Sequence, residues 1–252
     1  MPPALMEIAP PEAEARLAYG SHPSQFVDFR RGAGEGPRPL VVMIHGGFWR
    51  QRRTLTYAGH LCIALGREGF ATANIEYRRI GEDGGGWPGT FDDVRRAIAF
   101  AREHAAGFGA DPARTLLLGH SAGGHLALLA VAEYPGLCGA VSLGGVANLL
   151  RAHELRLGEG VAAEFMGGTP EAMPQAWRDA DPVHRPSAVP RVLIHGTADD
   201  IVPCEISRDF PEPRRYVELA GVDHFDPIDP ASASWPVVVL ELTALLRSPA
   251  RP

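Results

Sequence analysis

Short runs of apolar residues alternate along the chain with longer stretches in which apolar residues recur at helical spacing. The runs that indicate strands cover residues 40–44, 70–77, 116–118, 140–143, 192–195 and 215–219. The stretches that indicate helices cover residues 55–67, 94–100, 126–129 and 235–246. Strands that are apolar along their whole length are buried on both faces, which is typical of a parallel sheet between two layers of helices. The pattern therefore predicts an α/β fold with a mostly parallel, doubly wound sheet flanked by helices.

One segment departs from this alternation. Residues 146–190 are polar, rich in proline and glycine, and weakly periodic. A segment of this length between two strands is too short for an independent domain and predicts a small lid or a set of helical excursions over a site. No internal repeat or linker divides the rest of the sequence, so we expect residues 1–252 to form a single domain.

The sequence Gly-His-Ser-Ala-Gly-Gly at 119–124 places Ser121 between an apolar strand and an apolar helix. Glycines two residues before and two residues after a serine let neighbouring chain approach closely. The serine can then adopt strained dihedral angles that raise its hydroxyl above the edge of the sheet. This context predicts that Ser121 is a nucleophile rather than part of an ordinary glycine turn.

A serine hydroxyl needs a base and an acid to become a nucleophile, and both follow later strands. Asp199 and Asp200 come after the strand expected at 192–195, and His224 comes after the strand expected at 215–219. The carboxyl ends of parallel strands meet at one edge of the sheet, where ligands bind. We therefore expect Ser121, His224 and one of these two adjacent acids to form a catalytic triad.

The other nine histidines have different expected roles. His45 lies in a His-Gly-Gly loop and is expected to brace its backbone, whereas His120 and His125 lie on the serine's own turn, where proton abstraction is poorly oriented. Six histidines without a surrounding motif are expected to be structural or exposed: His22, His60, His104, His153, His184 and His195.

Composition excludes several classes of function. The formal net charge of −6 includes no basic stripe for nucleic acid and no polybasic segment for a membrane. All 24 basic residues are arginine, which excludes Schiff-base and Ser-Lys mechanisms. The three cysteines follow no metal-ligand spacing, so we expect reduced thiols. The expected triad needs no metal and no cofactor. Residues 1–25 lack the basic and apolar regions of a signal peptide, and we expect a cytoplasmic protein.

From Tyr19 to Leu246 the chain resembles the α/β-hydrolase superfamily. The order serine, acid, histidine is the order of its triad, and its pattern His-Gly-x-x-Asp-x-x-Val-Pro aligns with residues 195–203. The alignment implies that Asp199 is the acid, with Asp200 as the alternative. The resemblance also implies an oxyanion hole formed by the backbone N–H groups of Ala122 and of Gly47 and Phe48 in the loop HGGFW at 45–49.

The motifs HGGFW at 45–49 and GHSAGGHLA at 119–127 resemble the kynurenine formamidase branch of this superfamily and its esterase relatives. The resemblance implies acyl transfer to water from small carboxylic esters or aryl formamides. A dedicated kynurenine formamidase is the main alternative, and a peptidase-like hydrolase or a non-catalytic binding protein on the same scaffold is less favoured. A homodimer is among the assemblies that the sequence leaves open.

Aromatic and basic residues near the expected site suggest a substrate. Phe48, Trp49, Trp87 and Phe225 are expected to line an apolar pocket, although core packing is the competing interpretation for each. Three arginines at positions 50, 52 and 53 follow the HGGFW loop. They either attract a substrate carboxylate or form an ordinary solvated face.

Overall fold

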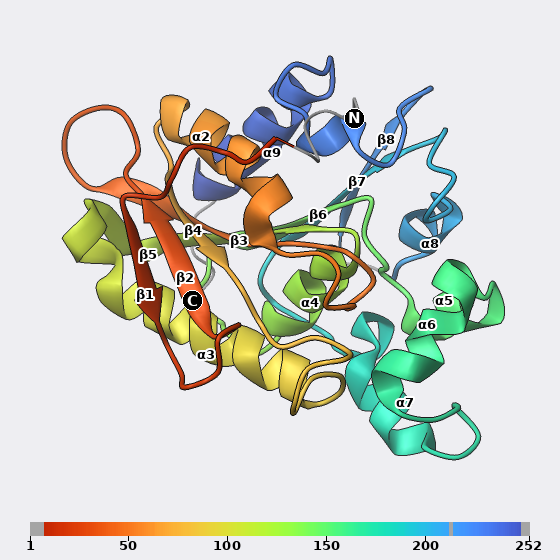
Figure 1. Cartoon of the computed structure of the whole chain (residues 1–252). Helices are drawn as coiled ribbons and strands as arrows, with labels where there is room; N and C mark the ends of the chain where they lie inside the picture. The colour runs from red at the N-terminus through yellow and green to blue at the C-terminus, as the bar shows by residue number, and fades with distance from the viewer. Residues whose placement is uncertain (1–7, 212–213, 248–252) are drawn as a thin grey trace.

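The computed structural model describes residues 8–211 and 214–247, so residues 1–7 of the N-terminal stretch considered above lie outside it. Its strands form one eight-stranded sheet in the order β1-β2-β4-β3-β5-β6-β7-β8 (Figure 1). The strands are β1 (Ala15–Ala18), β2 (Phe26–Arg30), β3 (Arg38–Ile44), β4 (Ala71–Ile75), β5 (Ala110–His120), β6 (Gly139–Leu143), β7 (Arg191–Gly196) and β8 (Arg215–Leu219). Each strand expected from the sequence is present, and most ends shift by no more than two residues, whereas β5 begins six residues before the expected run at 116–118.

The sheet is parallel from β4 through β3 and β5 to β8, whereas β1 and β2 are antiparallel to their neighbours. The apolar runs predicted the parallel strands because most of them are buried along almost their whole length, although β8, at the edge of the sheet, is partly exposed. They did not predict the two antiparallel strands. β1 lies at the edge with alternate residues exposed, and β2 carries Asp28 and Arg30 inside a five-residue strand.

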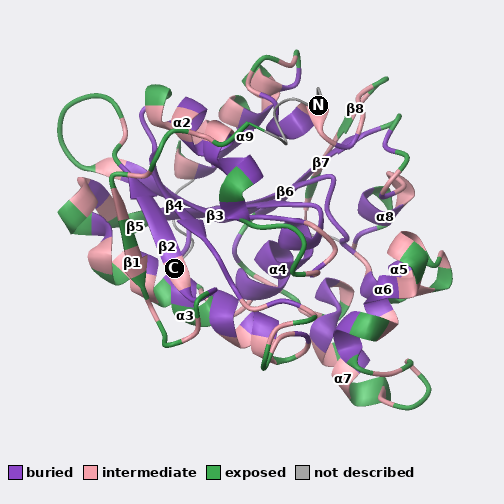
Figure 2. Cartoon of the chain, in the orientation of Figure 1, coloured by how far each residue is buried: buried purple, intermediate pink, exposed green. Residues whose placement is uncertain are grey.

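Helices cover both faces of the sheet (Figure 1). On one face, α2 (Gly59–Arg67), preceded by the short helix η1 (Leu55–Ala58), and α9 (Trp235–Arg247) pack against the strands. On the other face lie α3 (Gly89–His104), which runs into η2 (Ala105–Phe108), and α4 (Ala122–Ala130). The central strands are buried between these layers (Figure 2), which confirms the predicted doubly wound sheet.

The segment at 146–190 forms short helices between β6 and β7. These are α5 (Leu149–Glu154), α6 (Leu157–Met166), α7 (Pro174–Ala180) and η3 (Pro182–His184). The insertion is fastened to the core, since Val161, Phe165 and Trp177 are almost fully buried in it. Two further short helices, α8 (Glu205–Arg208) and η4 (Asp226–Ile228), lie in the loops after β7 and β8.

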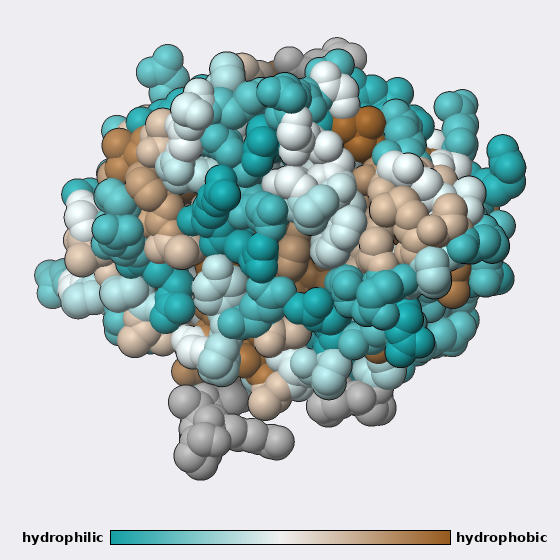
Figure 3. Space-filling view, turned by 90° about the horizontal axis from the view of Figure 1, so that it is seen from below, coloured by the Kyte–Doolittle hydropathy of each residue, from teal (hydrophilic) through white to brown (hydrophobic). Residues whose placement is uncertain are grey.

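The surface combines polar and apolar residues. On the face shown in Figure 3, hydrophobic residues form small patches separated by hydrophilic ones. Within the described ranges, none of the helices has the length and apolar character that a bilayer crossing requires.

Candidate active site

Ser121 lies in a tight turn between β5 and α4. Its backbone has φ of 57° and ψ of −122°, a strained conformation for a residue with a side chain. The flanking glycines are sterically required. A Cβ at Gly119 would lie 2.1 Å from the carbonyl oxygen of Gly123, and one at Gly123 would lie 2.0 Å from that of Ile44. The close approach predicted from the Gly-x-Ser-x-Gly pattern is therefore present.

Asp199 and His224 meet in the loops after β7 and β8. His224 Nδ1 lies 2.7 Å from Asp199 Oδ2. The other carboxylate oxygen, Oδ1, accepts backbone hydrogen bonds from Ile201 at 3.0 Å and from Val202 at 2.8 Å. Burial alone would raise the pKa of Asp199, but hydrogen bonds from His195 and His224 hold that pKa well below its ordinary value. Asp199 is therefore a carboxylate at neutral pH, whereas Asp200 is exposed.

A glycine on the neighbouring strand end makes room for this pair. Gly144 follows β6 with φ of +52°, and a Cβ there would lie 3.1 Å from Asp199 Oδ2 and 3.2 Å from His224 Nδ1. Any larger residue would press on the contact between carboxylate and imidazole.

Ser121 and His224 line one cavity of about 150 Å³. Both are almost fully buried, with 3 % of each residue exposed. In residues 8–211 and 214–247 no hydrogen bond joins Ser121 Oγ to the imidazole, so the structure brings the two side chains to a common cavity without closing that contact. Such contacts are often open in unliganded hydrolases and shorten when substrate binds.

His195 has a partner that the sequence did not predict. Its Nε2 lies 3.1 Å from Asp199 Oδ2 and 2.8 Å from the carbonyl oxygen of Val202, and its Nδ1 lies 2.7 Å from Ser207 Oγ. His195 is thus structural, as expected, but it also holds the acid of the candidate triad. The signal was present in the sequence, because His195 begins the same pattern that selected Asp199.

Tyr57 and His120 connect three of the loops. The Tyr57 hydroxyl accepts a hydrogen bond from Gly46 N at 2.5 Å and lies 2.9 Å from His120 Nδ1, while His120 Nε2 lies 3.0 Å from the carbonyl oxygen of His224. Burial and then the neighbouring His224 lower the pKa of His120 to about 3, which keeps this ring neutral. A neutral ring donates from Nε2 to the carbonyl oxygen of His224 and accepts at Nδ1 a hydrogen bond from the Tyr57 hydroxyl. His120 is therefore a link between loops rather than a base.

The HGGFW loop presents free donors beside Ser121. Gly47, Phe48 and Trp49 all have positive φ, of 111°, 53° and 56°. Within the described residues, the N–H groups of Gly47, Phe48 and Ala122 donate to no protein acceptor. Ala122 is the first residue of α4, where an N–H has no partner within the helix. Gly47 and Phe48 line the cavity and Ala122 follows Ser121 directly, so these unpaired N–H groups are the candidate donors to an oxyanion.

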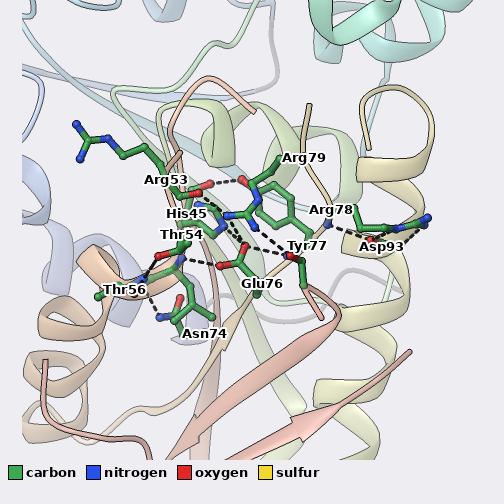
Figure 4. A network of polar contacts seen from close by, with 12 residues as sticks. His45, Arg53, Thr54, Thr56, Asn74, Glu76, Tyr77, Arg78, Arg79 and Asp93 are labelled. Carbon is green, nitrogen blue, oxygen red and sulfur yellow. Dashed lines mark hydrogen bonds and ion pairs between the residues drawn. The ribbon is translucent and has the colours of Figure 1, made fainter. Parts of the chain in front are cut away.

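A buried ionic network holds this loop from behind (Figure 4). His45 Nε2 lies 2.8 Å from Glu76 Oε1, which is also 3.1 Å from Arg79 Nη1. The other oxygen of Glu76 accepts from Leu55 N at 3.0 Å, and the Tyr77 hydroxyl donates to the carbonyl oxygen of His45 at 2.6 Å. His45 thus braces its loop as predicted. Glu76, at the end of β4, was missed because one acid after a strand carries no motif.

Glu76→Gln should lower the free energy of unfolding by about 3 kcal/mol at neutral pH, because it leaves His45 and Arg79 buried without their anion. Burial favours a raised pKa for Glu76, but His45 and Arg79 outweigh it and hold the pKa below its ordinary value. A carboxyl group whose pKa is lower in the folded than in the unfolded state stabilises the fold at pH values above its unfolded pKa. This contribution is lost as the pH falls through the folded-state pKa. The difference in the free energy of unfolding between Glu76→Gln and the wild type should therefore become smaller as the pH is lowered.

Urea unfolding at several pH values measures this difference, with an unchanged m-value as the check on two-state behaviour. Glu103→Gln is the matched control, since it removes the same charge from an exposed position on α3. Equal stability of the two variants at neutral pH would contradict the role assigned to Glu76.

Two of the four predicted pocket residues, Trp49 and Trp87, do not line the cavity that contains Ser121. Trp49 is 1 % exposed and stacks on Phe165 of α6 at a centroid distance of 4.6 Å. Trp87 is half-buried against the core and stacks on Phe91 of α3 at 5.6 Å. Positive φ at Phe48 and Trp49 turns consecutive side chains in different directions, so Phe48 lines the cavity while Trp49 enters the core. Phe225 lines the cavity as predicted.

The predicted lid packs beside the candidate oxyanion loop. Glu164 of α6 pairs with Arg50 at 2.7 Å, and a Cβ at Gly158 would touch the Phe48 ring at 3.2 Å. No residue of 146–190 lines the cavity that contains Ser121. The insertion therefore supports the loop from the side.

The cysteines have no catalytic arrangement. Cys62, Cys138 and Cys204 are free thiols, and burial raises the pKa of Cys62 to about 12. In the described part of the chain, no group of three or more histidine, cysteine or acidic side chains is arranged to hold a metal ion.

The sheet order, the serine turn and the Asp199–His224 contact define the α/β-hydrolase fold, and comparison with solved structures agrees. A truncated carbohydrate esterase from gut microbiota superposes with a TM-score of 0.79 at 19% identity, over 96% of this chain and 100% of that one. An esterase from Thermogutta terrifontis with propionate bound gives a TM-score of 0.70 at 23% identity, over 94% of each chain.

Sequence comparison gives relatives with named activities. A family model described as BD-FAE matches residues 29–135. The chain is 30% identical over 249 residues to the esterase LipC of Mycobacterium tuberculosis, covering 86% of this chain and 60% of LipC. It is 27% identical to an isoprenylcysteine alpha-carbonyl methylesterase of Arabidopsis thaliana, covering 77% of this chain and 50% of that protein. The chain thus spans between half and three fifths of the length of these two relatives.

Proposed function

We propose that this protein is a serine hydrolase that cleaves small carboxylic esters through an acyl-enzyme intermediate. The observation that carries the proposal is the 2.7 Å contact between His224 Nδ1 and the buried Asp199, with His224 and the strained Ser121 lining one cavity. Unpaired backbone donors at Gly47, Phe48 and Ala122 supply the remaining requirement. The relatives named above are esterases, which supports an ester as the substrate.

The residues divide the reaction between them. Asp199 holds the imidazole of His224 in the tautomer that leaves Nε2 free to take the proton of Ser121. The serine oxygen attacks the ester carbonyl, and the N–H groups of the 45–49 loop and of Ala122 bind the oxygen on which negative charge develops. His224 then gives its proton to the leaving alcohol. Water cleaves the acyl-enzyme by the same steps, with His224 again as base and then as acid.

The cavity favours short substrates. Its volume of about 150 Å³ is small, and Phe48, Ile201 and Phe225 provide apolar contacts. These side chains suit a short acyl chain or a single aromatic ring better than a polar sugar. The rate should therefore fall as the acyl chain of a nitrophenyl ester lengthens beyond a few carbons.

Aryl formamides are the second candidate substrates, and the resemblance of the HGGFW motif at 45–49 is the only observation that supports them. The same serine, histidine and oxyanion donors attack a formamide carbonyl, so the site accommodates this chemistry. The names of the relatives favour esters, and we rank the ester first for that reason.

A substrate panel tests the proposal. One enzyme preparation is assayed with phenyl acetate, nitrophenyl esters of increasing chain length, and N-formylkynurenine, and is then treated with a fluorophosphonate. We expect turnover of the short esters and a single labelled peptide that contains Ser121. A kcat/KM for N-formylkynurenine that exceeds that for every ester by orders of magnitude would instead identify a formamidase. Absence of both turnover and labelling would exclude a serine hydrolase.

A further inference from the structure

Two arginines lie at the cavity that contains the candidate nucleophile. Arg52 and Arg53 follow the HGGFW loop and line the same cavity as Ser121 and His224. Figure 4 shows the Arg53 side chain extending away from the buried network around Glu76. These cations are therefore beside the reacting groups rather than on a distant face.

The backbone that carries them is held in place. The carbonyl oxygen of Arg53 accepts a hydrogen bond from the Arg79 guanidinium, which is 4 % exposed and tied to Glu76. The N–H of Arg53 donates to the carbonyl oxygen of Arg50 at 3.3 Å. The stem of Arg53 packs on Gly47, where a Cβ would lie 2.4 Å from Arg53 Cβ. The network that contacts the HGGFW loop thus also fixes the backbone of Arg53, which directly follows Arg52 in the chain.

Their charges are not neutralised by the protein. Arg50, two residues earlier, pairs with Glu164 at 2.7 Å. Within residues 8–211 and 214–247 no carboxylate pairs with Arg52 or Arg53, and no aspartate or glutamate lines the cavity. Asp199 lies behind the imidazole with its side chain fully buried. Burial raises the pKa of Tyr57 in the cavity wall, and the charge of Arg53 is among the groups that oppose this rise.

We propose that the preferred substrates are esters that carry a carboxylate a few bonds from the scissile carbonyl, bound by Arg52 and Arg53. The inference rests on the proposed hydrolase and narrows its substrate class. A guanidinium forms charge-assisted, often bidentate hydrogen bonds with a carboxylate. The apolar residues of the cavity contact the rest of the molecule, and the arginines orient its charged end.

Two matched pairs of esters test the preference. On the acyl side, monoethyl succinate is compared with ethyl levulinate, in which a methyl ketone replaces the carboxylate. On the leaving-group side, 4-acetoxybenzoate is compared with 4-acetoxyacetophenone. The readout is the ratio of kcat/KM for the anionic ester to that for its neutral partner. Comparison of this ratio between variants cancels the intrinsic reactivity of the esters.

Arg52→Gln and Arg53→Gln should each lower the ratio about fivefold for at least one pair, which corresponds to about 1 kcal/mol for a partly exposed ion pair. The pair that responds shows which side of the ester the arginines contact. High salt should lower the ratio for the wild type and leave the ratio unchanged for the double variant, in which both Arg52 and Arg53 are replaced by Gln. Arg50→Gln, which removes the same charge from an arginine already paired with Glu164, should leave the ratio unchanged. An equal ratio in the double variant and the wild type would overturn the proposal.

A binding measurement separates this inference from the proposed hydrolysis. Calorimetry with the Ser121→Ala protein should detect binding of succinate or 4-hydroxybenzoate that the Arg52→Gln and Arg53→Gln substitutions abolish. If no ester is cleaved but this binding is present, the hydrolase fails and the anion site stands. If esters are cleaved but neither acid binds, the anion site fails alone.

Discussion

Ser121→Ala should lower kcat for a short nitrophenyl ester by about 10³-fold or more, with a much smaller change in KM. The substitution removes the atom that forms the acyl-enzyme and leaves the oxyanion donors in place. In the described residues Ser121 Oγ makes no hydrogen bond to protein, so its removal leaves no buried partner unsatisfied. The strained backbone is retained, because Ser121 N still donates to the carbonyl oxygen of Leu143. Steady-state kinetics and urea unfolding together should show lost activity at unchanged stability.

Ser207→Ala is an informative companion variant. Ser207 is also buried, but its hydroxyl lies 2.7 Å from His195 Nδ1, so its removal leaves the ring behind Asp199 with an unpaired nitrogen. We expect this variant to lose stability and to be labelled by a fluorophosphonate, whereas the Ser121 variant is not labelled. Residual labelling of Ser121→Ala at the wild-type rate would show that another residue is the nucleophile.

The sequence predicted the parts of this site that depend on local sequence. The Gly-x-Ser-x-Gly pattern specifies its own turn through steric contacts within a few residues, so Ser121 was found from six residues. Asp199 and His224 were found because parallel strands deliver their carboxyl ends to one edge. The rule for strand ends holds for any open α/β sheet, but the choice of Asp199 over Asp200 depended on the α/β-hydrolase pattern at residues 195–203.

The parts that were missed depend on packing between distant segments. The contact of Tyr57 with His120 joins residues 63 positions apart, and no local pattern marks either one as a partner of the other. The direction of Trp49 depends on positive φ at two non-glycine residues, which sequence alone does not indicate. Glu76 shows its role only when His45 and Arg79 are seen around it.

Different polar contacts hold the loops on the two sides of Ser121. On one side, Glu76 contacts His45 of the HGGFW loop, and Arg79, which pairs with Glu76, donates a hydrogen bond to the carbonyl oxygen of Arg53. On the other side, Asp199 is fixed by two histidines and two backbone N–H groups. His120 and Tyr57 connect the two sides. The loops around Ser121 are therefore positioned by polar contacts, whereas the sheet beneath them is held by apolar packing.

Asp199→Asn should lower kcat by about 10³-fold or more, whereas Asp200→Asn should change it by about twofold at most. The amide that replaces the Asp199 carboxylate can still accept the N–H groups of Ile201 and Val202 through its carbonyl oxygen. Its NH₂ group then faces His224 Nδ1, where a carboxylate oxygen stood. The imidazole must accept at Nδ1 and carry its proton on Nε2, so it no longer takes the proton of Ser121.

The two neighbouring substitutions form a matched pair because each replaces one carboxylate by an amide on the same loop, and Asp200 is exposed. The pH profile of kcat adds a second measurement, because a loss of structure alone would not change the shape of this profile. The lowered pKa of Asp199 keeps the wild-type carboxylate ionised through the acid range, so its protonation adds no step to the profile near its ordinary pKa. The Asp199→Asn enzyme should regain part of its rate at alkaline pH, where the alcohol of Ser121 is more readily deprotonated by hydroxide. A severe loss in Asp200→Asn with little loss in Asp199→Asn would move the acid to position 200.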